Sequence, residues 1–253
     1  MKRDLNYDLG TKATDEQVEN REKITGLFRK RPMPDEHLLS NLGLYMRSSA
    51  LAKILFMNEL YEHILDIPGV IMEFGTWWGQ NLVLAENLRA IYEPFNNTRQ
   101  IIGFDTFSGY EGFSDNDRET SVIREGGYTT SEKYKFYLDR LLALHEGNNA
   151  LGYFRKYRLV EGNVIDTVPE FFKGRPETVV ALAYFDLALE EPTRVCLETI
   201  RPHLIPGSLI MLDQFNSLEA PGETLAFKGV FGSKGYTIKK SKYLPDRTLV
   251  FIK

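Results

Sequence analysis

Acidic, amide and glycine residues that could hold a ligand follow several short apolar segments of the chain. Carboxylate and amide side chains can bind hydroxyl groups, accept a proton or coordinate a hard cation. The carboxyl ends of parallel strands meet on one edge of a sheet, so residues in these positions would converge there. The residues concerned are Glu73, Asp105, Gly162, Asn163, Asp186, Asp213 and Gln214.

The turn Glu73–Gly79 follows the first of these apolar segments and opens a helical one. Gly75 allows a tight backbone turn, and Gly79 allows a ligand or strand to approach the start of the helix. The spacing is not G-x-G-x-x-G, and an acid beside a helix N-terminus disfavours a pyrophosphate. We therefore expect a cationic ligand without phosphates. S-adenosylmethionine, with its ammonium and sulfonium groups, meets this requirement. Trp77 or Trp78 could offer its ring to the sulfonium, with core packing as the alternative for each. A turn without a ligand is the alternative.

Two further positions could bind the adenosine part of such a ligand. Asp105 ends the next apolar segment, where a carboxylate can accept from both ribose hydroxyls. In an adenosine-binding sheet the loop with Gly162 faces the base, so Asn163 could hydrogen-bond it and Val164 could pack against it. The alternative is a plain turn leading to a helix that begins near Pro169.

Three oxygen-bearing side chains close two later strands. Asp186, Asp213 and Gln214 could converge on Mg²⁺ or Ca²⁺, cations that take oxygen ligands. Gln214 supplies an uncharged oxygen, which would lower the affinity for the cation. Asp186 is suited to accept a proton from a hydroxyl group. Aspartates that serve only buried hydrogen bonds are the alternative.

Short apolar runs alternate with helical periodicity over most of the chain, which predicts an α/β fold with a mainly parallel sheet. The last two runs are separated by a turn and indicate a C-terminal antiparallel hairpin. The expected strands span 70–74, 100–104, 157–160, 178–185, 208–212, 236–239 and 247–252, and the expected helices include 49–65, 81–92 and 194–203.

The sequence indicates two regions. Residues 1–66 are predicted to form a loosely attached polar arm and a helical extension, and residues 67–253 the sheet domain. About 50 residues separate Asp105 from Tyr157, more than a common connection needs. We expect residues 107–156 to form a lid over the site, with a surface excursion carrying one packed helix as the alternative.

Composition excludes several classes of function. The 253 residues carry a formal net charge of −4 and the sequence pI is 5.7, which does not favour nucleic acid as a partner. No apolar run approaches the roughly 20 residues of a membrane span. Cys196 is the one cysteine, so no intrachain disulfide can form and a reducing cytoplasm is the expected location.

Five motifs follow one another along about residues 45–215. They are Glu73–Gly79, Gly103–Gly109, Gly162 with Asp166–Pro169, Asp186 with Glu191–Thr193, and Leu212-Asp213. Together they resemble the macrocin O-methyltransferase family, and within it the TDP-rhamnose 3′-O-methyltransferase type found in enediyne pathways. The resemblance implies enzymes that methylate deoxysugar hydroxyls in antibiotic biosynthesis with S-adenosylmethionine and Mg²⁺.

The resemblance implies a Rossmann-like class I methyltransferase sheet, a small-molecule sugar or nucleotide-sugar acceptor and a homo-oligomer. Asp186 would be both a metal ligand and the general base, and Asp213 a metal ligand. Two positions depart from the family's pattern, because Gln214 and Ala188 stand where acids are usual. The expected cofactor-binding residues are Glu73, Gly75, Thr76, Trp77, Gly79, Asp105, Thr106, Phe107, Gly162, Asn163 and Val164.

Two other classes of protein fit parts of the pattern. An NAD(P)-dependent oxidoreductase would use the same type of sheet, although Glu73 and the glycine spacing disfavour it. A non-catalytic protein that binds nucleotide sugars would explain Gln214 and Ala188.

Overall fold

The computed structural model describes residues 13–121 and 123–253. The first 12 residues of the predicted arm lie outside the described residues. Within the described part of the chain, no helix is long and apolar enough to cross a membrane.

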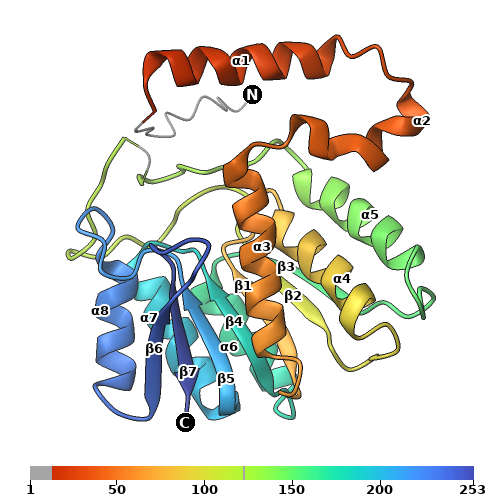
Figure 1. Cartoon of the computed structure of the whole chain (residues 1–253). Coiled ribbons are helices and arrows are strands. Elements are labelled where there is room, and N and C mark those ends of the chain that lie inside the picture. Colours follow the sequence, from red (N-terminus) through yellow and green to blue (C-terminus); the bar gives the residue numbers. More distant parts are fainter. Residues whose placement is uncertain (1–12, 122) are drawn as a thin grey trace.

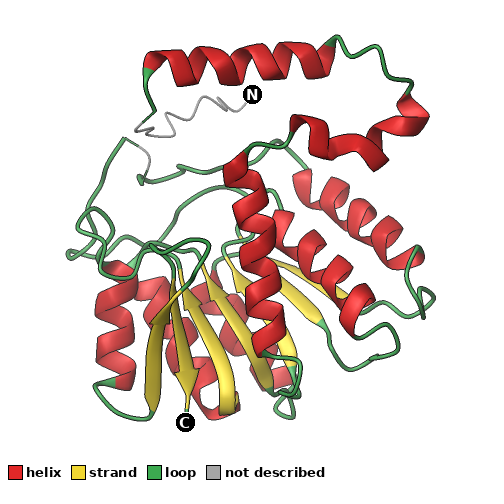
Figure 2. Cartoon of the chain, in the orientation of Figure 1, coloured by secondary structure: helices red, strands yellow, loops and turns green. Residues whose placement is uncertain are grey.

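A single seven-stranded sheet forms the centre of the molecule, in the order β3-β2-β1-β4-β5-β7-β6 (Figures 1 and 2). The first five strands in the chain pair in parallel, and β7 pairs antiparallel with both β5 and β6. The sequence therefore predicted both the parallel sheet and its antiparallel hairpin. The strands are β1 (Val70–Phe74), β2 (Ile101–Asp105), β3 (Tyr157–Glu161), β4 (Val180–Phe185), β5 (Leu204–Leu212), β6 (Tyr236–Lys240) and β7 (Thr248–Ile252).

Helices cover both faces of the sheet (Figure 2). α3 (Ser48–His63), α4 (Gln80–Tyr92) and α5 (Tyr134–Gly147) share one buried apolar cluster with it. The opposite cluster includes side chains of α6 (Val164–Gly174), α7 (Glu190–Ile200) and α8 (Gly222–Phe231). Every residue of β1 is buried, as expected of a central parallel strand. This rigid centre places the ends of β1, β2, β4 and β5 next to one another.

The N-terminal region contains a helix where the sequence indicated only a polar arm. α1 (Asp15–Arg29) begins with a capping box between Thr14 and Gln17 and has no buried residue. α2 (Asp35–Leu38) and the 3₁₀ helix η1 (Leu39–Tyr45) follow, and Phe28 of α1 packs edge-on against Tyr45 at 5.2 Å. Figure 1 shows α1 at the end of the molecule where the loop after β2 runs. α3 differs from α1, because its Phe56 and Leu60 are fully buried in the core of the sheet.

α6 and α8 differ from what the sequence indicated. α6 begins at Val164, earlier than Pro169, because the Asn163 side chain accepts the backbone N–H of Ile165 at 3.0 Å and so caps the helix. α8 was not predicted from the sequence. A 3₁₀ turn, η2 (Arg201–His203), follows α7 directly.

Candidate active site at the carboxyl edge of the sheet

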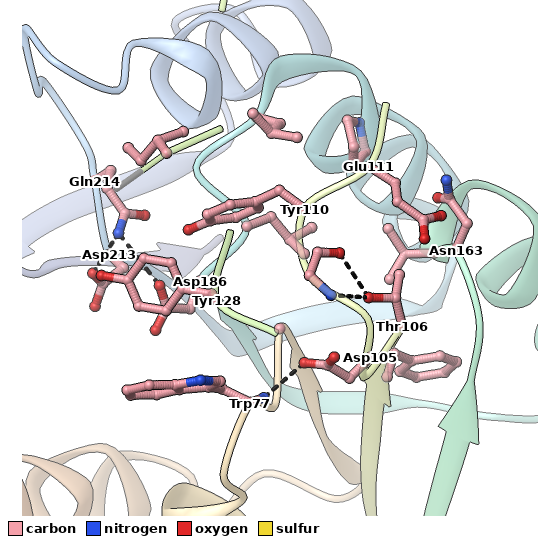
Figure 3. A pocket seen from close by; sticks show the side chains of 18 of the residues that line it. Trp77, Asp105, Thr106, Tyr110, Glu111, Tyr128, Asn163, Asp186, Asp213 and Gln214 are labelled. Atoms are coloured by element: carbon pink, nitrogen blue, oxygen red, sulfur yellow. Dashed lines mark hydrogen bonds between the residues drawn. The ribbon is translucent and has the colours of Figure 1, made fainter. Parts of the chain in front are cut away.

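A pocket of about 310 Å³ opens at the carboxyl edge of the strands (Figure 3). Its walls come from the ends of β1, β2, β4 and β5, the start of α6, the loop after β2 and the turn before β7. Nine of the residues predicted from the sequence line it. Six are predicted cofactor residues: Gly75, Trp77, Asp105, Thr106, Asn163 and Val164. The three predicted catalytic and metal residues are Asp186, Asp213 and Gln214.

The turn between β1 and α4 brings two strand ends into contact. Gly75 has a φ of +90°, and a Cβ atom there would overlap the carbonyl oxygen of Asp186. Glycine is therefore required for β1 to approach the end of β4. Trp77 also has a left-handed φ, of +49°, and its backbone N–H donates to Oδ2 of Asp105 at 2.7 Å.

Glu73 occupies a different place from the one expected. Its side chain is 2 % exposed, and its Oε1 accepts a hydrogen bond from Nδ2 of Asn81 at 2.6 Å. Successive side chains of a strand point to opposite faces, and this one points toward α4, beneath the turn. Burial raises the pKa of Glu73 to about 8, so most of it is protonated at pH 7. The expected anionic charge at the mouth of the crossover is thus not provided by Glu73.

Packing between two helices explains why position 79 is a glycine. Gly79 is the N-cap of α4 with a φ of +75°, and a Cβ atom there would lie 2.5 Å from Cδ1 of Leu138. The glycine therefore permits close contact between α4 and α5. Thr76 and Phe107 are buried, and Gly162 has a φ of +131°. None of these four residues contributes to the lining of the pocket as the structure describes it.

Asp105 is held by the backbone on both of its oxygens. Oδ2 accepts from Trp77, and Oδ1 accepts from the backbone N–H of Phe107 at 2.6 Å. Burial raises the pKa of Asp105, although these donors oppose the shift. The backbone of Thr76 is a third donor to this carboxylate, and since a carboxylate has about four acceptor positions, a ribose hydroxyl could still bind. Beside it, the hydroxyl of Thr106 donates to the carbonyl oxygen of Gly109 at 2.7 Å (Figure 3).

The three polar side chains at the ends of β4 and β5 lie together, as predicted. Nε2 of Gln214 donates to Oδ2 of Asp213 at 2.7 Å and to Oδ1 of Asp186 at 3.3 Å (Figure 3). Oδ1 of Asp213 forms an ion pair with Nε of Arg247. Burial raises the pKa of Asp213 well above its usual range, Asp186 raises it further, and Arg247 opposes both.

Glu223 supports this cluster from behind and was missed by sequence reasoning. The residue is fully buried at the start of α8, and its Oε1 accepts the backbone N–H groups of Leu187 and Ala188 at 3.1 and 3.2 Å. The Ala188 position, where the family usually has an acid, is thus held through its backbone. Glu223 lies in α8, a helix that the sequence did not predict, so no local pattern pointed to this residue. Burial raises the pKa of Glu223 to about 7.

The expected lid has two distinct parts. The loop after β2 carries Tyr110 and Tyr128 into the pocket wall. α5 instead packs Leu138 and Leu142 fully into the core, so it belongs to the body of the protein. The sequence analysis did not assign either tyrosine a role. Arg247, which comes from the hairpin turn, was likewise missed.

The oxygen donors in this cluster can be compared with those that a divalent cation needs. Among the described residues, no group of three or more His, Cys, Asp and Glu side chains is placed to hold a metal. Asp186 and Asp213 supply two carboxylates, and Oε1 of Gln214 is buried without a hydrogen-bond partner. The amide orientation follows from its hydrogen bonds, so a half-turn of that amide would present a third oxygen. Two carboxylates and one amide are thus the oxygen donors at this end of the pocket.

The chain is similar along nearly its whole length to an enzyme of known structure. Calicheamicin methyltransferase CalS11 is 38 % identical, with a TM-score of 0.91 over 95 % of this chain and 94 % of that chain. Its apo structure, described as TDP-rhamnose 3′-O-methyltransferase, gives 36 % identity and a TM-score of 0.84 over 95 % and 96 % of the two chains. The chain belongs to the macrocin O-methyltransferase family of sugar O-methyltransferases. The family assignment from the sequence motifs is confirmed.

A curated member of this family matches over a shorter segment. It is 8-demethyl-8-(2,3-dimethoxy-alpha-L-rhamnosyl)-tetracenomycin-C 4′-O-methyltransferase from Streptomyces olivaceus, 26 % identical over 162 residues. The match covers 59 % of this chain and spans about half of that relative's length, 54 %. A scan against models of protein families finds none that matches.

More distant structures share the fold alone. The O-methyltransferase NovP is 17 % identical with a TM-score of 0.60 over 80 % of this chain and 79 % of its own. The O-methyltransferase from Bacillus cereus, solved in complex with SAH, is 10 % identical with a TM-score of 0.51 over 97 % of this chain and 94 % of its own. The Rossmann-like methyltransferase fold predicted from the sequence is confirmed.

Proposed function

We propose that this member of the family uses S-adenosylmethionine to methylate a hydroxyl group of a deoxysugar, with a nucleotide-linked sugar such as TDP-rhamnose as the acceptor. The similarity to CalS11, described as a TDP-rhamnose 3′-O-methyltransferase, supports the acceptor class. The observation that carries the proposal is that predicted cofactor residues and Asp186 line the same pocket. Assembly into a homo-oligomer stays a prediction from the sequence.

The adenosine part of the cofactor would bind at the end of the pocket formed by β2 and α6. Asp105 has acceptor positions for ribose hydroxyls, and Nδ2 of Asn163 is available because only its Oδ1 is used in capping α6. Val164 adds an apolar surface for the base. A pocket of about 310 Å³ is at the lower end of the size range of ligand pockets.

The chemical step needs one proton acceptor. When bound, S-adenosylmethionine would supply the methyl group, which would pass to the acceptor oxygen as the C–S bond breaks and the C–O bond forms, with S-adenosylhomocysteine as the leaving product. The hydroxyl proton passes to the Asp186 carboxylate. Asp186 is held in place through its backbone N–H, which donates to the carbonyl oxygen of Phe74 at 2.9 Å, and through Gln214.

Asp186, Asp213 and Gln214 are the residues that would hold a divalent cation. When bound, such a cation would lower the pKa of the acceptor hydroxyl and hold a neighbouring pair of hydroxyls. Asp213 is kept in position by Arg247, independently of any cation.

Two measurements test the proposed function. Calorimetry should show binding of S-adenosylhomocysteine and none of NAD or NADP. Methyl incorporation from labelled S-adenosylmethionine into a panel of TDP-sugars should then identify an acceptor. Binding of NAD(P) without S-adenosylhomocysteine would support an oxidoreductase instead. Binding of the sugars and the cofactor product without methyl transfer would indicate a non-catalytic binding protein.

A further inference from the structure

Three aromatic rings line the pocket beside the acids at the ends of β4 and β5. Tyr128 contacts Trp77 edge-on, with ring centroids 5.2 Å apart and an interplanar angle of 70°. Tyr110 contacts Tyr128 in the same manner, at 5.5 Å and 69°. Figure 3 shows the three rings gathered around Asp186. We call Trp77, Tyr110 and Tyr128 the aromatic wall.

The backbone of the loop after β2 is built to present the two tyrosines. The N–H of Tyr110 donates to the carbonyl oxygen of Gly127 at 2.9 Å, and the N–H of Gly126 donates to the carbonyl oxygen of Tyr110 at 3.0 Å. A Cβ atom at Gly109 would lie 2.6 Å from the backbone of Gly126, so only glycine fits where these two segments of the loop approach each other. Tyr128 has a φ of +57°, a conformation that costs energy for a residue with a large side chain.

The Tyr110 hydroxyl has no hydrogen-bond partner among the described residues, although the ring is partly buried. Figure 3 shows this hydroxyl on the side of the ring that faces Gln214. Burial, together with the nearby Asp186, raises the pKa of Tyr110 well above its usual value. The hydroxyl therefore keeps its proton and can donate to a ligand in the pocket.

The charges of the pocket favour a neutral ligand at this end. Two acids, Asp186 and Asp213, line the pocket at the ends of β4 and β5, and Arg247 is the one basic side chain among the described lining residues. Arg247 is already paired with Asp213. A diphosphate would be repelled by this surface, whereas sugar hydroxyls can donate to the carboxylates.

We propose that Tyr110 and Tyr128 form the acceptor subsite, which takes the pyranose ring of a neutral sugar. The C–H face of the ring packs on the aromatic wall, and its hydroxyl edge faces Asp186. The nucleoside diphosphate of a nucleotide-linked acceptor stays outside the acidic end of the pocket. This assignment rests on the proposed function and extends it to named residues on the loop after β2.

The test measures the binding of two sugars directly. TDP-L-rhamnose and methyl α-L-rhamnoside are titrated calorimetrically into the full chain saturated with S-adenosylhomocysteine. In Tyr110→Ala and Tyr128→Ala the affinity for each sugar should fall by about tenfold, by a similar factor for both probes, because the lost contact is with the ring. Tyr128→Phe keeps the ring and should lose less affinity for both probes than Tyr128→Ala does.

Matched measurements separate this effect from a folding defect. The affinity for S-adenosylhomocysteine should be unchanged within error in both Ala variants. Tyr153→Ala alters a tyrosine that is 82 % exposed and should leave both this affinity and the thermal midpoint unchanged. Sugar affinities that are unchanged in both Ala variants would overturn the assignment. Equal losses for S-adenosylhomocysteine and sugar would also overturn it, as would a wild-type protein that binds neither sugar. A wild type that binds the sugars but transfers no methyl group would refute the proposed function and leave the subsite standing.

Discussion

The carboxylate of Glu223 accepts the backbone N–H of Gln214 at 3.0 Å. Its second oxygen accepts two N–H groups from the loop after β4, so one buried acid of α8 joins the loops that follow β4 and β5. These loops carry Asp186 and Gln214 at the pocket. Glu223 does not itself contribute to the described lining, and its effect on the reaction must therefore pass through the backbone it holds.

Glu223→Gln tests this arrangement. The amide offers one acceptor oxygen and turns an NH₂ group toward a backbone donor, which should cost about 1–3 kcal/mol of unfolding free energy. The experiment is done at pH 8, because burial raises the pKa of Glu223 to about 7 and the acid is mainly ionised there. We expect a lower kcat with little change in cofactor affinity. Glu219→Gln, at an exposed position, should behave like the wild type. Equal urea midpoints for both variants would contradict the proposed clamp.

Asp186→Asn should remove the proton acceptor while preserving the shape of the side chain. Loss of a general base lowers the rate by about 10²–10⁴-fold, and we expect kcat to fall at least 100-fold. The affinity for S-adenosylhomocysteine should stay within about twofold, since no charged cofactor group is assigned to this residue. Asp66→Asn, on an exposed residue after α3, is the matched control. Full turnover in the Asp186 variant would exclude it as the base.

Glu73→Gln should change how stability depends on pH. The pKa of Glu73 is raised from 4.5 to about 8 by burial, so the folded protein holds this proton more tightly than the unfolded chain. Its contribution to stability is complete below pH 4.5 and is lost as the pH rises through 8. The slope amounts to at most about 1.4 kcal/mol per pH unit. The free energy of unfolding, measured with urea, should fall less between pH 6 and pH 8.5 in the variant than in the wild type. An equal decrease in the free energy of unfolding of both proteins would show that folding does not raise the pKa of Glu73.

Arg247→Gln should leave Asp213 without its counter-charge. The Asp213 side chain is 7 % exposed and that of Arg247 is 23 % exposed. We therefore expect the free energy of unfolding to fall by about 1–3 kcal/mol, which is less than for a fully buried pair. Arg194→Gln removes a surface ion pair with Glu191 and should cost less than about 1 kcal/mol. Denaturant unfolding of both variants gives the comparison. Equal losses of unfolding free energy in the two variants would mean that the Asp213–Arg247 pair contributes no more than a surface ion pair.

Gln214→Asp should strengthen the binding of a divalent cation. A third carboxylate replaces the amide, and we expect the Mg²⁺ affinity measured by calorimetry to rise about tenfold or more. In the wild type, a chelator should suppress methyl transfer and added Mg²⁺ should restore it. Asn97→Asp adds the same charge at an exposed site and should leave the affinity unchanged. Chelator-resistant activity in the wild type would leave Asp213 a structural role with Arg247.

The sequence by itself determined the order of strands and helices in the sheet domain and the acids at the strand ends. Apolar periodicity and the residues that terminate each strand are local properties, so Asp105, Asp186 and Asp213 could be assigned to one edge before any contact was known. Local pattern also sufficed for the C-terminal hairpin. It did not suffice for α8, whose residues gave no recognised signal.

Only the tertiary structure decided which distant side chains complete the site. Glu223 lies far along the chain from Leu187, as do Arg247 from Asp213 and Tyr128 from Trp77, and no local pattern encodes such pairings. The structure also decided that Glu73 points toward α4, because the pairing of β1 in the sheet fixes which face each side chain takes. Burial there leaves the acid largely protonated, which composition and spacing could not reveal.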